Sequence, residues 1–138
     1  MAKLDGIIRF RKWELDEQRR DLAVLLMDRT ELVSSLEQLD AEMLAQKSMA
    51  QNDVGTMTLG AYIEGARIKR ARILDDIRKK NQEIEEKQDV VSDAFRELKT
   101  FEIAERRQIE IFRKELDRYE QDELDELGRR AFEAVSAL

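Results

Sequence analysis

The sequence predicts an all-α protein: two long helices in an antiparallel coiled-coil hairpin, forming one unit over residues 1–138. Three observations predict it. The chain has no proline and only five glycines, charged residues make up 41% of it, and apolar residues recur at heptad spacing. Its eight aromatic residues are too few to fill a globular core at normal packing density. We therefore expect a narrow apolar stripe between two helices.

The first helix is predicted over residues 4–50. Its expected seam has Met1, Ile8, Leu15, Leu22, Arg29, Leu36, Met43 and Ala50 at position a, and Leu4, Arg11, Gln18, Leu25, Leu32, Leu39 and Gln46 at position d. Leu26 and Val33 are expected to widen this seam at position e. Polar residues in such a seam cost stability and fix the register of the two helices.

The turn is predicted over residues 51–58, the only cluster of Asn, Asp and Gly in the chain. Thr58 is the expected N-cap of the second helix, with Thr56 as the alternative. That helix is predicted over residues 59–134. Its seam has Ile63, Arg70, Ile77, Ile84, Val91 and Leu98 at position a, and Ala66, Ile73, Lys80, Lys87, Ala94 and Phe101 at position d. An eleven-residue step then leads from Leu98 to Ile109, and a step of this length locally unwinds a left-handed supercoil.

The two predicted helices differ in length, about 70 Å against about 114 Å at 1.5 Å per residue. Folding at the turn pairs residues whose numbers add to roughly 110, so the first helix covers the second only to about residue 106. The remaining segment still carries an apolar stripe, which implies a partner outside the hairpin. Its apolar residues are Ile109, Ile111, Phe112, Leu116, Tyr119, Leu124, Leu127, Phe132 and Val135.

Missing residue types argue against catalysis. The chain has no His and no Cys, which removes the imidazole base, the thiol nucleophile, and the usual ligands of zinc. We therefore expect no enzyme activity, cofactor or metal. No apolar run of 18 residues is present, and charges at Lys3 and Asp5 interrupt the start, so we expect neither a membrane span nor a signal peptide, and a cytoplasmic location.

Charge is uneven along the chain. Residues 67–80 have seven basic and two acidic side chains, whereas residues 115–126 have seven acidic and one basic. The acidic stretch is interpreted as a solvated helix face or as a docking face for a partner, and not as a carboxylate active site. The basic stretch is interpreted as a solvated flank or a protein-binding patch. Nucleic acid is disfavoured, because the chain is acidic overall and the stretch lacks interleaved aromatic residues.

Two smaller features, Trp13 and a line of residues beside the turn, each allow two interpretations. Trp13 falls away from the seam, so it is either an interface residue or packed against the second helix near residues 97–101. Tyr62, Ala66 and Ile73 form a line beside the turn, for which core packing is favoured over partner binding.

Both ends of the chain resemble the flagellar FliJ family. Residues 8–23 (IRFRKWELDEQRRDLA) resemble the family's start, a basic and apolar stretch that leads into a charged helix. Residues 94–99 (AFRELK), 105–107 (ERR), 120–121 (EQ) and 124–126 (LDE) resemble its closing pattern. The resemblance covers nearly the whole chain, and the turn region is its least characteristic part.

The resemblance implies a stalk similar to the central subunit of rotary ATPases, working in flagellar type III protein export and therefore in motility. The implied partners are the export ATPase ring, the cytoplasmic domain of the membrane export gate, and export chaperones. The residues we assign to the ATPase side are Arg9, Arg11, Lys12, Trp13, Phe112, Leu116, Tyr119, Glu120, Gln121, Asp125 and Glu126. Those assigned to the gate side are Tyr62, Ala66 and Ile73.

Two other interpretations remain open at the level of sequence. The uncovered stripe could join two copies into a structural homodimer, whereas the stalk interpretation predicts a monomer in isolation. A stalk subunit of a related injectisome or of another rotary ATPase is also compatible with the pattern.

Overall fold

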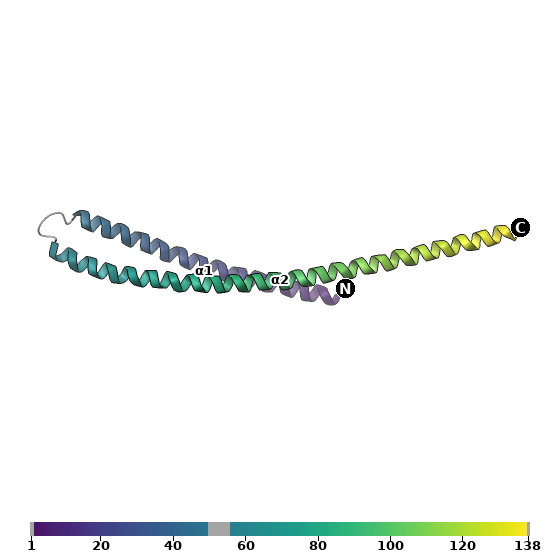
Figure 1. The fold of residues 1–138 in the computed structure, drawn as a ribbon, viewed down its shortest axis with the longest axis horizontal. Coiled ribbons are helices and arrows are strands. Elements are labelled where there is room, and N and C mark those ends of the chain that lie inside the picture. Colours follow the sequence, from purple (N-terminus) through teal and green to yellow (C-terminus); the bar gives the residue numbers. More distant parts are fainter. Residues whose placement is uncertain (1, 50–55, 138) are drawn as a thin grey trace. The chain divides into compact units, whose positions relative to one another are not determined.

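The computed structural model describes the backbone of residues 2–49 and 56–137 and the side chains of residues 4–49 and 58–137. Within these ranges the chain forms two helices, α1 (Ala2–Met49) and α2 (Thr56–Ser136), and no strand (Figure 1). The all-α prediction is confirmed, and the helix ends lie within three residues of the expected ones. The absence of proline allows α2 to run for 81 residues without a break.

The second helix begins three residues earlier than predicted, at Thr56. Residues 51–55 of the predicted turn lie outside the described residues, and Thr56 already belongs to α2. Thr58 therefore lies inside the first turn of α2 and is not its N-cap, which corrects the first of the two capping alternatives. Gly60 and Gly65 also lie within α2, although each costs about 1 kcal/mol of helix stability relative to alanine.

The chain divides into two compact units. Unit 1 comprises Met1–Trp13 and Phe95–Leu138, and unit 2 comprises Glu14–Ala94. Each unit therefore takes one part of α1 and one part of α2.

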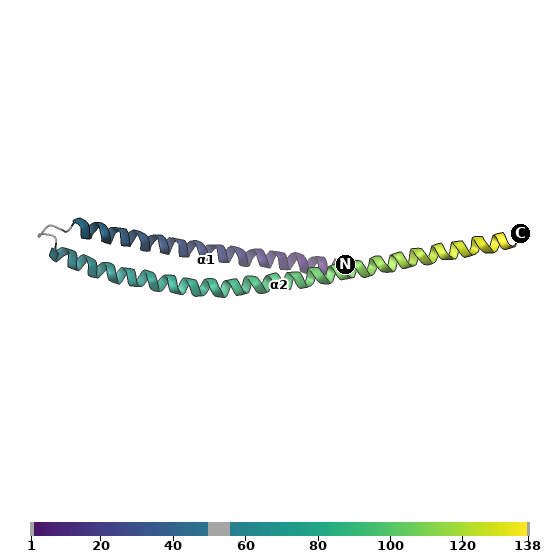
Figure 2. The same ribbon diagram turned by 45° about the horizontal axis from the view of Figure 1, so that its top comes forward.

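In unit 2 the two helices run antiparallel beside each other (Figures 1 and 2). Cross-helix ion pairs fix how they are aligned. Arg70 Nε lies 2.9 Å from Asp40 Oδ1, and Lys80 Nζ lies 3.7 Å from Asp28 Oδ2. The residue numbers of these pairs add to 110 and 108, in agreement with the expected alignment of roughly 110.

The core of unit 2 is the stripe that the heptad predicts. Leu39, Ala66 and Ile73 form a buried cluster, against which Leu36, Met43 and Ile77 pack. Leu15, Ile84 and Ala94 are also buried. Taking both units together, the predicted seam positions are buried or half-buried from Leu4 to Met43 in α1 and from Ile63 to Phe101 in α2. Gln46 is exposed, and of the two expected flanking residues only Leu26 is half-buried, whereas Val33 is exposed.

Polar residues that interrupt the seam of unit 2 find polar partners on the opposite helix. Lys87 Nζ donates to Gln18 Oε1 at 2.9 Å, and Arg29 Nη1 donates to Asn81 Oδ1 at 3.2 Å. Gln18, Arg29 and Lys87 are half-buried and Asn81 is exposed, so these polar groups keep contact with water. A shift of one helix along the other would separate each pair, so the polar positions favour a single register.

In unit 1 the first turns of α1 pack against the part of α2 that begins at Phe95. Ile8 and Leu98 are buried there, and Arg11 Nη1 donates to Glu97 Oε2 at 2.7 Å. The guanidinium carbon of Arg11 also lies 5.8 Å from the ring centre of Phe10 and 5.6 Å from that of Phe101. Arg11 is thus a packing residue of this unit as well as a charged one.

Candidate docking surface

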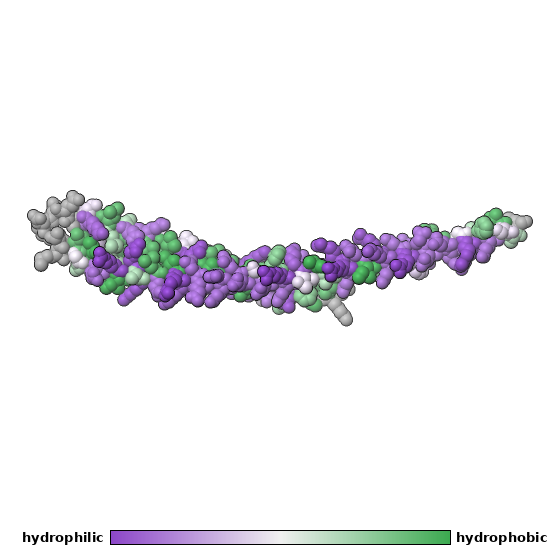
Figure 3. Space-filling model, in the orientation of Figure 1, coloured by the Kyte–Doolittle hydropathy of each residue, from purple (hydrophilic) through white to green (hydrophobic). Residues whose placement is uncertain are grey.

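The C-terminal part of α2 is uncovered. From residue 106 to residue 137 every side chain is exposed except that of Glu126, which is half-buried. The end of coverage agrees with the expectation of about residue 106. In the space-filling view this part of unit 1 shows separate apolar areas among hydrophilic side chains (Figure 3). We call residues 106–137 the tail.

Apolar side chains of the tail follow one face of the helix. Ile109, Phe112, Leu116 and Tyr119 are spaced by three, four and three residues, which is the spacing that α1 covers elsewhere on α2. We call these four residues the tail stripe. Leu116 is 46% exposed and the other three also have exposed side chains. An exposed stripe with the spacing of a helix–helix seam is typical of a surface that another protein covers.

The tail stays helical without packing because local contacts support it. Arg130 Nε lies 3.3 Å from Glu126 Oε1, Arg129 also pairs with Glu126, and Gln121 Nε2 donates to Asp125 Oδ1 at 3.1 Å. Such pairs three or four residues apart stabilise a helix by roughly 0.2–0.5 kcal/mol each. A hydrogen bond with Glu123 raises the pKa of Tyr119 above its ordinary value.

The tail is strongly acidic in its middle. Residues 115–126 carry seven carboxylates and one cation, Arg118, which gives a net charge of −6. Glu126 pairs with arginines, but Glu115, Asp117, Glu120 and Asp122 make no ion pair within the described chain. No group of three or more His, Cys, Asp or Glu side chains in the described ranges is arranged to hold a metal ion. In sequence, these carboxylates lie beside Leu116 and Tyr119 of the tail stripe, whereas Arg113 and Lys114 lie beside Phe112.

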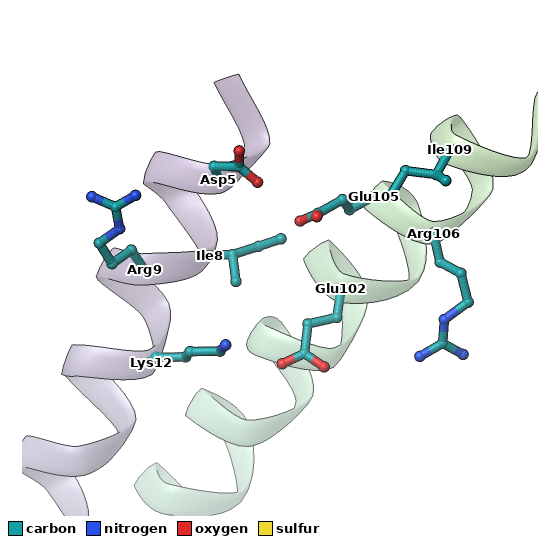
Figure 4. A pocket seen from close by; sticks show the side chains of 8 residues that line it. All are labelled: Asp5, Ile8, Arg9, Lys12, Glu102, Glu105, Arg106 and Ile109. Atoms are coloured by element: carbon teal, nitrogen blue, oxygen red, sulfur yellow. The ribbon is translucent and has the colours of Figure 1, made fainter. Parts of the chain in front are cut away.

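A groove lies in unit 1 where the first turns of α1 face α2 (Figure 4). Ile8 and Lys12 point from α1 toward α2, and Glu105 points from α2 toward α1, whereas the guanidinium groups of Arg9 and Arg106 point away from the groove. The groove is lined by Asp5, Ile8, Arg9, Lys12, Glu102, Glu105, Arg106 and Ile109. It leads to the tail stripe, because Ile109 belongs to both.

The residues assigned to the ATPase side fall into two groups. Arg9, Lys12 and Trp13 are exposed, as are Phe112, Leu116, Tyr119, Glu120, Gln121 and Asp125 of the tail, and Glu126 is half-buried. Arg11 is the exception, because it is occupied by Glu97, Phe10 and Phe101. These contacts give Arg11 a structural role, and its assignment as a docking residue stays a prediction.

The residues assigned to the gate side do not form a common surface. Ala66 and Ile73 lie in the core cluster of unit 2 with Leu39, so they have little surface to offer a partner. Tyr62 alone has a side chain at the surface. The core-packing interpretation of this line therefore holds for two of its three members.

Sequence reasoning missed an apolar face on the first turns of α1. Ile7, Phe10 and Trp13 are exposed, and the rings of Phe10 and Trp13 stack with their centres 6.1 Å apart. Trp13 is 59% exposed, which agrees with the interface alternative. The signal that could have found this face is the spacing of three residues, since Ile7, Phe10 and Trp13 all fall outside the seam.

Aromatic residues are concentrated in unit 1, which holds seven of the eight in the chain. They are Phe10, Trp13, Phe95, Phe101, Phe112, Tyr119 and Phe132, and all but Phe101 are exposed. Aromatic side chains are enriched in protein interfaces. Unit 2, in contrast, has only Tyr62 and an aliphatic core. Exposed aromatic surface therefore gathers in unit 1.

The basic stretch of unit 2 is largely neutralised. Arg70 pairs with Asp40, Lys80 with Asp28 and Glu83, and both Arg78 and Lys79 pair with Asp75. The hydrogen bond from Arg78, followed by that from Lys79, lowers the pKa of Asp75. Four of the seven cations in residues 67–80 are thus engaged within the unit, which favours the interpretation of this stretch as a solvated flank.

Comparisons with protein-family models, with curated proteins and with solved structures found no match to this chain. Among the described residues, neither helix contains a stretch that is both long and apolar enough to cross a membrane. What the protein does is therefore inferred from its exposed surfaces.

Proposed function

We propose that this chain is a non-catalytic stalk and adaptor of flagellar type III protein export. It docks its tail on the export ATPase ring and links that ring to the membrane export gate and to export chaperones. The observation that carries the proposal is the tail, a helix whose apolar stripe is left exposed by the described residues of its own unit. The resemblance of both chain ends to the FliJ family supports the choice of system.

The division of the chain supports an adaptor role. A rod with an aliphatic seam and polar register pairs, as in unit 2, is suited to hold a distance, while the exposed aromatic side chains of unit 1 are suited to recognition. Such a protein needs no chemistry of its own. It acts on an enzyme by binding some conformations of that enzyme better than others.

The test uses the full chain and the flagellar export ATPase from the same genome. We expect the chain to sediment as a monomer alone, to be captured by the ATPase, and to change the rate of ATP hydrolysis. The double substitution Leu116→Asp and Tyr119→Asp should abolish capture, whereas Ile111→Asp, which places a charge on the other side of the same tail, should not. A chain that ignores the ATPase would refute the proposal.

A homodimeric scaffold is the second candidate, since two tail stripes could cover each other. Sedimentation equilibrium separates the two functions. A stable dimer that is split by Leu116→Asp would favour the scaffold, and a species of 16.2 kDa at all concentrations would exclude it.

A further inference from the structure

We propose that the tail stripe is covered by a single basic amphipathic helix contributed by another protein. This inference rests on the proposed function, because it specifies the chemistry of the partner at the same docking surface. It combines two observations on the tail: the spacing of its apolar side chains, and the net negative charge of residues 115–126, which include Leu116 and Tyr119 of the stripe.

The spacing specifies a helix. The part of α2 that is covered in unit 1 contains Leu98 and Phe101, three residues apart, and its cover is the helix α1. After the eleven-residue step from Leu98, Ile109, Phe112, Leu116 and Tyr119 resume a spacing of three and four residues. A ridge of side chains at such intervals fits the grooves of another helix. A second helix on the tail would therefore repeat the packing that α1 already makes.

The charge specifies a basic helix. Where α1 covers α2 in unit 1, Glu97 of α2 is matched by Arg11 of α1. On the tail, Glu115, Asp117, Glu120 and Asp122 have no such match within the described chain. A partner with Lys or Arg beside its apolar stripe would supply the missing cations, and opposite charges beside a helical seam set the choice of partner. A parallel second copy of the tail would instead bring two segments of net charge −6 together.

The test measures binding of a synthetic probe to the full chain by fluorescence anisotropy. The probe is a labelled peptide of about three heptads, a length that matches the acidic and apolar part of the tail, with Leu at positions a and d and Lys at positions e and g. A matched peptide keeps the leucines and replaces each Lys with Glu. Both are titrated at low salt and at 0.15 M salt.

We expect the Lys peptide to bind at least ten times more tightly than the Glu peptide, and to weaken as salt rises. Leu116→Asp should reduce its affinity at least tenfold, although the substitution adds a negative charge that alone would attract the peptide. Ile111→Asp adds the same charge on the side of the helix away from the stripe, so it should retain the wild-type affinity.

Three results would overturn the inference. If the Lys peptide binds Leu116→Asp as tightly as it binds the wild type, only charge matters. If the Glu peptide binds as tightly as the Lys peptide, charge does not matter, and if neither peptide binds, the partner is not a helix. A chain that captures the export ATPase but ignores the Lys peptide would refute the helical partner and leave the proposed function standing. Binding of the Lys peptide without capture of the ATPase would refute the proposed function and leave the helical partner standing.

Discussion

Arg11 and Glu97 lie 86 positions apart in the chain, and Arg11 Nη1 donates a hydrogen bond of 2.7 Å to Glu97 Oε2. The contact ties α1 to α2 in unit 1, and the guanidinium also lies against the rings of Phe10 and Phe101. The two partners of this ion pair therefore contribute unequally to the stability of the unit.

The first prediction concerns this inequality. Arg11→Ala should destabilise the protein more than Glu97→Ala, because it removes packing against two rings as well as the ion pair. The coupling between the two substitutions in a double-mutant cycle should be about 0.5 kcal/mol, as for other exposed pairs. Urea unfolding measures all three variants. Equal losses for the two single variants would show that the ring contacts contribute nothing.

The second prediction compares a covered isoleucine with an uncovered one. Ile73 is 9% exposed in the core cluster of unit 2, whereas Ile111 is 57% exposed in the tail. Ile73→Ala should lower the free energy of unfolding by about 2–3 kcal/mol, because it leaves a cavity beside Leu39. Ile111→Ala should change it by less than about 0.5 kcal/mol. Similar effects at the two positions in urea unfolding would contradict the burial pattern.

The third prediction concerns a lysine in the seam. Lys80 occupies a seam position and reaches outward to Asp28 and Glu83, and the hydrogen bond with Glu83 is the main cause of its raised pKa. Lys80→Leu should raise the urea midpoint, because an apolar side chain fills the stripe better than a lysine stem. Lys79→Leu, an equal charge change at an exposed position off the seam, is the control. A lower midpoint for Lys80→Leu alone would mean that the lysine is stabilising there.

The fourth prediction uses the phenol of Tyr119 as a probe of the tail. Its pKa is raised above 10.0 by the hydrogen bond with Glu123. Because the folded-state pKa is raised, this contact stabilises the tail below about pH 10 and is lost as pH rises through the raised value. In a Tyr62→Phe background, absorbance at alkaline pH follows Tyr119 alone. Glu123→Gln should lower the Tyr119 pKa, and an unchanged titration would exclude the contact.

Much of the fold follows from the sequence. The heptad positions became the covered stripe because they face the other helix at the alignment seen in the cross-helix ion pairs. Coverage ended near residue 106 because the two helices differ in length. These are consequences of periodicity and helix rise, which a single sequence contains.

The candidate site was less predictable, because exposure depends on which residue reaches which neighbour. Arg11 resembles a surface cation in sequence, yet Phe101, 90 positions away, provides a ring for it to pack on. From the sequence, Ala66 and Ile73 fit either a partner-binding surface or the core. In the structure they pack against Leu39 and belong to the core. The face of Phe10 and Trp13 was missed because heptad analysis follows the seam and neglects the other sides of a helix.

Hydrogen exchange of the full chain with and without the export ATPase tests the central claim most directly. In the free protein we expect backbone amides of residues 109–124 to exchange much faster than those around Leu39 and Ile73, because the side chains of residues 109–124 are exposed. Addition of the ATPase should slow exchange over residues 109–124 and leave unit 2 unchanged. If the ATPase binds and the tail continues to exchange at its free rate, the tail stripe is not the docking surface.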